Sequence, residues 1–288
     1  MKIGFAGLGV MGGPMARHLV HAGHKVSAFN RSIDKASAWA KLAGGAVANT
    51  VQAAAEGAEV FILCVGNDDD VRQVVSQALT HLQPGAVIID HTTTSAVVAR
   101  EMSDAASSSG RHFIDAPVSG GQAGAENGQL SVMAGGDTEA LARVEPILKT
   151  YSKAIKRMGP PGSGQLAKMV NQIAIAGVVQ GLAEAVHFAH CAGLDTDAVY
   201  DAISKGAAQS WQMDNRWKTM TRGEFDFGFA VDWMRKDLGL VLDEARANGA
   251  RLDMTSLVDS YYAEVQAMGG ARWDTSSLAA RLQKPSSD

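Results

Sequence analysis

The first part of the chain alternates short apolar runs with segments whose apolar residues recur at helical spacing. The apolar runs predict β-strands at residues 2–6, 25–29, 59–65, 86–90, 112–116 and 131–134. The segments between them predict helices at residues 11–22, 33–42, 70–82 and 95–108. Strands that alternate with helices of this length predict βαβ units, which form a parallel sheet with helices on both faces.

The pattern changes near residue 160. The run Gly159-Pro160-Pro161-Gly162-Ser163-Gly164 interrupts regular structure, and the strand signals stop beyond it. Residues 165–192 predict one long helix that is apolar on most sides, as a helix at a domain or subunit interface would be. We therefore predict an α/β domain and an all-α C-terminal domain joined by a long helix. The expected bounds are residues 1–162 for the first domain, 163–193 for the helix and 194–288 for the second domain.

Composition narrows the classes of protein. The net charge is -4, so no general basic field is available to attract nucleic acid. No apolar run approaches the ~18 residues that a membrane helix needs, and the first residues enter a strand pattern without a secretory signal. The two cysteines, Cys64 and Cys191, lie far apart and imply no disulfide framework. We expect a cytoplasmic protein with no nucleic-acid or membrane partner.

A glycine-rich loop, Gly7-Leu8-Gly9-Val10-Met11-Gly12, follows the first predicted strand and precedes a predicted helix. In this context the spacing is typical of a dinucleotide-binding site. Gly7 permits the tight turn, Gly9 leaves room for the pyrophosphate, and Gly12 lets the helix approach the sheet. The phosphates would bind N–H groups at the helix N-terminus. The alternative is an ordinary glycine-rich turn between a strand and a helix.

The end of the second predicted strand discriminates between NAD and NADP. NAD sites usually carry Asp or Glu there, which binds the ribose 2′-hydroxyl. This chain has Asn30-Arg31-Ser32 instead. Arg31 can form charge-assisted hydrogen bonds to a 2′-phosphate, and Ser32 can add a hydroxyl. We predict NADP(H) as the preferred cofactor, with NAD(H) as a second one. The alternative for Arg31 is a surface arginine without a ligand.

Two further segments carry candidate chemistry. Ser119-Gly120-Gly121 follows the fifth predicted strand, at the edge where open α/β sheets bind ligands, and suits a small anion. Lys168 lies among apolar residues near the beginning of the long helix, where desolvation would suit its amine to proton transfer. Asn171 and Gln172 follow on or near the same helical face. A turn without a ligand and an exposed helix lysine are the alternatives for these segments.

Other candidates have simpler explanations. The pair Lys236-Asp237 is typical of a solvated surface, and an isolated tryptophan such as Trp211 is typical of a core. Two histidines share a helix with Cys191, but no further ligands converge on them, so we predict no metal site. The run Asp68-Asp69-Asp70 would supply N-caps to the helix that follows it.

Together these segments resemble the β-hydroxyacid dehydrogenase family over nearly the whole chain. The family includes 3-hydroxyisobutyrate dehydrogenases, tartronate semialdehyde reductases and the succinic or glyoxylic semialdehyde reductases. Ordered motifs at family spacing are more specific than any one motif alone. The motifs are Gly7–Gly12 with Pro14-Met15-Ala16, Asp115–Gly121, Gly128-Gln129-Leu130 with Gly135-Gly136, Gly162–Gln165 with Lys168 and Asn171, and Lys236-Asp237-Leu238.

The resemblance implies that the α/β domain is a Rossmann domain joined by the long helix to the helical domain. It also implies roles for individual residues. Lys168 would be the proton donor and acceptor, and Ser119, Gly120 and Gly121 would hold the carboxylate of a small substrate. The substrate pocket would also include Asn171, Gln172 and Trp211. The residues expected along the cofactor are Val65, Asn67 and Thr93, with Lys236 reaching the active site from the helical domain. That domain often mediates dimers or tetramers in the family, so we expect a homodimer or homotetramer.

The chain departs from the family at two places. Many members have Asn where this chain has Gln172, which is similar to the tartronate semialdehyde reductase branch. The loop Cys64-Val65-Gly66-Asn67 also lacks the Leu-Pro of many relatives. We expect reversible hydride transfer between NADP(H) and a small 3-hydroxy acid or its semialdehyde, with the acid left open. The alternatives are an imine reductase, a 6-phosphogluconate-type decarboxylating dehydrogenase and an NADP(H)-binding scaffold without chemistry.

Overall fold

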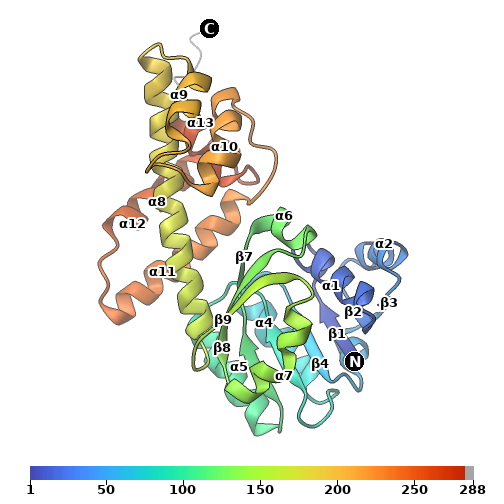
Figure 1. Ribbon diagram of the computed structural model, residues 1–288. Helices are drawn as coiled ribbons and strands as arrows, with labels where there is room; N and C mark the ends of the chain where they lie inside the picture. Colours follow the sequence, from blue (N-terminus) through green and yellow to red (C-terminus); the bar gives the residue numbers. More distant parts are fainter. Residues whose placement is uncertain (283–288) are drawn as a thin grey trace. The chain divides into compact units, whose positions relative to one another are not determined.

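The computed structural model describes residues 1–282 and divides into two compact units after Lys168. Unit 1 contains the sheet and its helices, and unit 2 is helical (Figure 1). Helix α8 (Ser163–Cys191) begins in unit 1 and continues into unit 2. The predicted fold class, an α/β Rossmann domain with a helical C-terminal domain, is confirmed.

Within residues 1–282, unit 1 is built on a nine-stranded sheet of order β3-β2-β1-β4-β5-β6-β8-β7, with β9 paired to β8. From β3 to β6 every neighbouring pair is parallel. The carboxyl ends of these strands therefore share one edge of the sheet, and the strand order reverses beside β1, where doubly wound sheets bind ligands. The strands are β1 (Lys2–Ala6), β2 (Lys25–Phe29), β3 (Ala46–Val47), β4 (Val60–Leu63), β5 (Val87–Asp90), β6 (His112–Asp115), β7 (Val118–Ser119), β8 (Leu130–Gly136) and β9 (Ser152–Gly159).

The expected parallel sheet holds from β3 to β6 but does not extend to β8. Strands β8 and β9 are parallel to each other. Strand β8 runs antiparallel to both β6 and β7, and it is longer than the predicted strand at residues 131–134. The link between β7 and β8 contains only the short helix α6 (Gly121–Glu126). A parallel crossover needs about a dozen residues or more, so this link returns the chain in the opposite direction.

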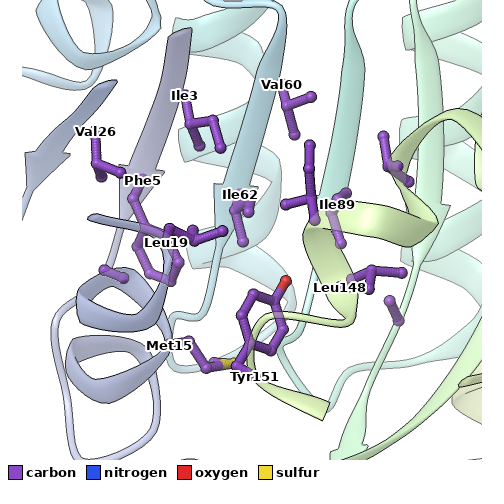
Figure 2. Packing of buried hydrophobic residues seen from close by; sticks show 14 of the residues in the cluster. Ile3, Phe5, Met15, Leu19, Val26, Val60, Ile62, Ile89, Leu148 and Tyr151 are labelled. Carbon is purple, nitrogen blue, oxygen red and sulfur yellow. The ribbon is translucent and has the colours of Figure 1, made fainter. Parts of the chain in front are cut away.

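Helices cover both faces of the sheet. On one face lie α1 (Gly12–His21), α2 (Ile33–Ala43), α6 and α7 (Thr138–Leu148), and on the other lie α3 (Val51–Ala55), α4 (Asp68–Leu79) and α5 (Ala96–Ser108). Alternate residues of the central strands supply the two cores. In β4, Val60 and Ile62 belong to the first core, whereas Phe61 and Leu63 belong to the second. Figure 2 shows the first core, which includes Met15 of α1.

Unit 2 is a set of helices packed around a core to which α8 contributes. The other helices are α9 (Thr196–Ile203), α10 (Trp211–Arg222), α11 (Val231–Asn248), α12 (Asp253–Ala267) and α13 (Leu278–Leu282), with a 3-10 turn at Thr275–Ser277 before α13. Helix α8 is long and apolar enough to cross a membrane by length and composition, with 44% of its most apolar window buried. Val179, Leu182 and Val186 of α8 pack in the unit 2 core with Trp217 and Tyr262, which accounts for part of that apolar surface.

Candidate functional site

The loop between β1 and α1 contains glycines that are present for different reasons. Gly7 has a φ of 97°, and a Cβ there would collide with the carbonyl oxygen of Cys64. A Cβ at Gly12 would collide with the carbonyl oxygen of Gly7. At Gly9, by contrast, a Cβ would meet no atom within 4 Å. Packing therefore requires Gly7 and Gly12, whereas Gly9 borders open space, as a loop that receives a pyrophosphate at a helix N-terminus must.

Asn30, just beyond β2, holds this loop in place. Its Oδ1 accepts a hydrogen bond from the Leu8 N–H at 2.9 Å, and its Nδ2 donates to the Ser32 carbonyl oxygen at 3.1 Å. A carboxylate could accept the same bond from Leu8, but it would also place a negative charge at the strand end where dinucleotide-binding folds bind the ribose. The amide keeps the structural bond without that charge. The glycine loop and the end of β2 together fit an adenine dinucleotide.

Arg31 is 82% exposed and forms an ion pair with Asp70, a contact that the sequence does not predict. Its Nη1 lies 3.4 Å from Oδ1 of Asp70, whose Oδ2 accepts a bond from the Gly66 N–H at 3.1 Å. The prediction that residues 68–70 cap α4 is wrong, because Asn67 is the N-cap and accepts a bond from the Asp70 N–H at 2.9 Å. Asp70 instead links Arg31 to the loop after β4.

Gln165, in the first turn of α8, is fully buried and uses both ends of its amide. Its Nε2 donates to the Thr92 carbonyl oxygen at 2.8 Å, and its Oε1 accepts from the Thr94 N–H at 3.0 Å. The Thr92 hydroxyl in turn accepts from the Val65 N–H at 3.0 Å. The loops after β4 and β5 are thus fixed to the beginning of α8 by buried polar contacts. Thr93, expected near the nicotinamide, lies between Thr92 and Thr94 in the chain.

Asp115, at the end of β6, also binds the N-terminus of α8. Its carboxylate accepts bonds from the N–H groups of Gly162 at 2.8 Å and Gln165 at 3.0 Å. A Cβ at Gly135 or Gly164 would crowd this carboxylate, which explains why both positions are glycine. Burial raises the pKa of Asp115 to about 6, against the opposing effect of the backbone N–H bonds. A carboxylate at a helix N-terminus also compensates the positive end of the helix dipole.

Lys168 follows one turn after Gln165 and is the last residue of unit 1. It is 8% exposed, so it is not the exposed helix lysine that the sequence left as an alternative. Its backbone belongs to the stretch of α8 that Asp115 and Gln165 fix at the carboxyl ends of β5 and β6. In the sequence, Asp115 and Gln165 belong to the family motifs, but no pattern there indicates that they position Lys168. The available signal was an acidic residue that ends an otherwise apolar strand.

The Ser119 loop lies at the end of β7. Val118 and Ser119 pair with Val132 and Ser131 of β8, which fixes where the strand ends. Gly120 and Gly121 have φ values of 137° and 62°, a region that side-chain-bearing residues rarely adopt. A Cβ at Gly121 would meet no atom within 4 Å. The loop therefore presents a hydroxyl and backbone N–H groups from a defined strand end, which suits a small anion.

The candidates in unit 2 form a network of their own. Gln172 donates from Nε2 to Oδ2 of Asp237 at 2.7 Å and accepts at Oε1 from Nδ2 of Asn171 at 2.8 Å. Nζ of Lys236 lies 3.1 Å from Oδ1 of Asp237. Asp237 is 2% exposed, so the interpretation of Lys236-Asp237 as a solvated surface pair is wrong. Gln172 provides a hydrogen bond that this buried carboxylate needs.

Trp211, the first residue of α10, is exposed rather than part of a core as an isolated tryptophan usually is. The Arg216 guanidinium lies 5.1 Å from its ring centre and 4.8 Å from that of Phe227, a cation–π arrangement. On α8, Sγ of Cys191 lies 3.6 Å from Nε2 of His187. Through residue 282, no group of three or more His, Cys, Asp or Glu side chains is placed to hold a metal ion.

Comparison with known proteins covers both units. Residues 2–159 match the family described as the NAD binding domain of 6-phosphogluconate dehydrogenase. Residues 162–282 match the family described as NAD-binding of NADP-dependent 3-hydroxyisobutyrate dehydrogenase. An uncharacterized oxidoreductase of Shewanella frigidimarina is 58% identical over 98% of both chains. The 2-hydroxy-3-oxopropionate reductase of Escherichia coli is 33% identical over 98% of this chain and 97% of its own.

A solved structure is similar to this chain over both units. The 3-hydroxyisobutyrate dehydrogenase of Mycobacterium tuberculosis, solved with L-serine, superposes with a TM-score of 0.89 at 34% identity. The match covers 98% of this chain and 99% of that chain. The chain therefore belongs to the β-hydroxyacid dehydrogenase family, whose members are NAD(P)-dependent 3-hydroxyacid dehydrogenases that act on a CH–OH group.

Proposed function

We propose that this protein interconverts a small 3-hydroxy acid and its semialdehyde with NADP(H) as the preferred cofactor. One structural observation supports this proposal above the others. Asp115 joins the beginning of α8 to the end of β6, and Gln165 joins it to the loop after β5, with Lys168 on the next turn of the helix. The glycine loop ends β1 at the same edge of the sheet. Open α/β sheets bind their ligands at this edge.

The roles of the chain's own groups follow from this placement. Ser119 and the N–H groups of Gly120 and Gly121 bind the substrate carboxylate and orient the aldehyde carbon. The nicotinamide, when bound, supplies a hydride to that carbon or accepts one from it. In reduction, the Lys168 ammonium donates a proton to the oxygen that becomes the hydroxyl. In oxidation, the neutral amine removes that proton. A positioned acid of this kind contributes about 10²–10⁴-fold to the rate.

The preference for NADP(H) is proposed from the charges near the end of β2. Asn30 replaces the acid of NAD sites while keeping the bond to Leu8, and exposed Arg31 provides a cation for the 2′-phosphate. Asp70 competes for Arg31, but an exposed ion pair contributes about 1 kcal/mol at most. A charge-assisted pair between guanidinium and phosphate is stronger and often bidentate. The description of the family matched by residues 162–282 as NADP-dependent is consistent with this preference.

The substrate class is proposed from the Ser119 loop and from a relative. Hydroxyl and N–H donors at a strand end suit a carboxylate better than an uncharged carbonyl compound. The Escherichia coli relative is named for 2-hydroxy-3-oxopropionate, a small aldehyde that carries a carboxylate. We therefore place tartronate semialdehyde, which reduces to a 3-hydroxy acid, first among the candidate substrates. Succinic semialdehyde and glyoxylate, which reduce to a 4-hydroxy and a 2-hydroxy acid, are included in the panel to define the position of the hydroxyl.

The test is to follow oxidation of NADPH and of NADH with these semialdehydes and with the uncharged ester of each. We expect turnover of at least one carboxylate-bearing aldehyde and little of its ester, with NADPH binding at least about tenfold tighter than NADH, as for a charge-assisted pair. Arg31→Glu should reverse the cofactor order. Turnover of cyclic imines alone would point to an imine reductase. Tight NADPH binding without turnover of any aldehyde would point to a scaffold.

A further inference from the structure

His91 lies directly after β5 and is one of the few fully enclosed ionisable groups near the site. Its Nδ1 lies 2.6 Å from the Ala116 carbonyl oxygen, and its Nε2 lies 2.9 Å from the Tyr151 hydroxyl. A carbonyl oxygen only accepts hydrogen bonds, so Nδ1 carries the proton and donates it to Ala116. Nε2 must then be the acceptor, and the Tyr151 hydroxyl donates to it. The result is a directional chain from Tyr151 through His91 to Ala116.

Tyr151 holds the imidazole in a fixed orientation. It lies in the turn between α7 and β9, is fully buried, and belongs to the same hydrophobic cluster as Met15 and Leu148 (Figure 2). The tyrosine and histidine rings meet edge to face, with centres 5.5 Å apart and planes at 88°. Burial lowers the pKa of His91 to about 4, so the imidazole is neutral at physiological pH and keeps one tautomer.

Ala116 is the residue at which the chain leaves β6 for the Ser119 loop. Its N–H donates to the Asp90 carbonyl oxygen at 2.7 Å, while its own carbonyl accepts from His91. Pro117 follows with no N–H and a restricted φ, and its carbonyl accepts from the Met133 N–H at 3.1 Å. The orientation of the Ala116–Pro117 peptide therefore sets the direction in which β7 starts.

We propose that His91 and Tyr151 are positioning residues that orient the Ser119–Gly121 loop through the Ala116 carbonyl and so set the affinity for the substrate carboxylate. The inference rests on the proposed function for the identity of the ligand. Both side chains are buried, and the contacts described run to Ala116 and to each other. Their effect on the reaction is therefore indirect. It falls on substrate binding rather than on hydride or proton transfer.

Tyr151→Phe tests this with a matched control at the next residue, Ser152, which begins β9. The change keeps the ring in the core and removes the hydroxyl that orients His91. Ser152→Ala also removes one buried hydroxyl, whose 2.7 Å bond runs to the Leu148 carbonyl oxygen and not toward the loop. We expect Tyr151→Phe to raise KM for the semialdehyde roughly fivefold, as for one net hydrogen bond, with kcat and the Kd of NADPH within about twofold. Ser152→Ala should change none of the three.

Replacement of His91 provides a second, independent comparison if Tyr151→Phe does not fold. His91→Asn keeps a donor near the position of Nδ1, whereas His91→Leu leaves the Ala116 carbonyl without it. The KM of the asparagine variant should lie closer to that of the wild type than the KM of the leucine variant. Equal KM values for wild type, asparagine and leucine proteins would overturn the inference.

Amide hydrogen exchange of Val118–Gly121 separates this inference from the proposed function, because it needs no turnover. Exchange in the full chain should be faster in Tyr151→Phe than in the wild type or Ser152→Ala, without a matching change in the Gly7–Gly12 loop. Exchange rates identical in all three proteins would contradict a positioning role. Faster exchange, in a protein whose wild type reduces no semialdehyde, would support the positioning role and refute the proposed substrate.

Discussion

Nη1 of Arg31 lies 3.4 Å from Oδ1 of Asp70, which places a carboxylate beside the cation that we propose for the 2′-phosphate. Asp70 is fixed by its bond from the Gly66 N–H, whereas the Arg31 side chain is 82% exposed. A phosphate that binds Arg31 must therefore compete with a stationary acid. The acid does not select NAD by itself, because it lies on α4 rather than at the end of β2.

Asp70→Asn should strengthen NADPH binding. The amide oxygen can still accept from Gly66, while the negative charge near Arg31 is removed. Because an exposed pair contributes up to about 1 kcal/mol, we expect the Kd of NADPH to fall by roughly two- to fivefold. The Kd of NADH should stay unchanged. Asp69→Asn is the control, since Asp69 pairs with Arg72 on the helix surface. An equal gain for both cofactors, measured by fluorescence titration, would contradict the account.

Gly9 and Gly12 should respond differently to the same small substitution. Gly9→Ala adds a methyl group where no atom lies within 4 Å, so the unfolding temperature should match that of the wild type. The methyl group should nevertheless block the pyrophosphate and weaken NADPH binding at least about tenfold. Gly12→Ala collides with the Gly7 carbonyl and should cost about 1–3 kcal/mol of stability. A Gly9→Ala protein that binds NADPH normally would place the phosphates elsewhere.

Two buried groups should give opposite pH dependences of stability. The native pKa of His91 is about 4, below its ordinary value of 6.5, so the unfolded chain takes up the proton first and stability falls as pH drops from about 6.5 to 4. The native pKa of Asp115 is about 6, above its ordinary value of 3.8. The native state then takes up the proton first, so the contribution of Asp115 to stability rises as pH drops from about 6 to 4. Each effect is roughly 3 kcal/mol.

Urea unfolding at pH 7, 5 and 4 measures both effects as differences from the wild type. His91→Gln should be less stable than the wild type at pH 7, and that deficit should shrink as pH falls. The free energy of unfolding of Asp115→Asn, relative to that of the wild type, should decrease as pH falls over the same range. Parallel pH profiles for all three proteins would mean that neither group titrates differently in the native and unfolded states.

Gln172→Asn should destabilise unit 2. The shorter side chain cannot keep the 2.7 Å bond to buried Asp237, and an under-bonded buried carboxylate costs about 1–3 kcal/mol. Gln209→Asn is the control in the same unit, because Gln209 and its partner Asp214 are both exposed and water can replace the lost bond. The free energy of unfolding should fall for the first variant and change little for the second. Equal decreases in the free energy of unfolding would show that the bond to Asp237 stabilises the protein no more than an exposed bond does.

The central strands could be predicted because they are short, largely apolar runs that are buried in the sheet. Residues 2–6 and 25–29 were predicted with the bounds that the structure shows for β1 and β2. Strand β9 was missed because it is an exposed strand with Lys153, Lys156 and Arg157, which gives no apolar run. Helix α7 was missed although its apolar residues have helical spacing, and it contains Pro146, a residue that usually ends a helix.

The candidate site was predictable where its chemistry is local in sequence. The glycine loop needs only a strand, a turn and a helix in succession. Asp115 and Gln165 act across 47 and 73 residues, to Gly162 and Thr92, and no local pattern indicates such pairs. The same applies to Arg31 and Asp70, because their contact depends on which strands are neighbours.

Lys168→Ala tests the central claim most directly. Turnover of the best semialdehyde should be measured with NADPH beside the wild type and Lys156→Ala, a control at an exposed lysine of β9. We predict that kcat falls by about 10²–10⁴-fold in Lys168→Ala, as for a lost general acid, with the Kd of NADPH unchanged. The control should match the wild type. A Lys168→Ala enzyme that turns over within about threefold of the wild type, far less than a lost general acid costs, would contradict the account.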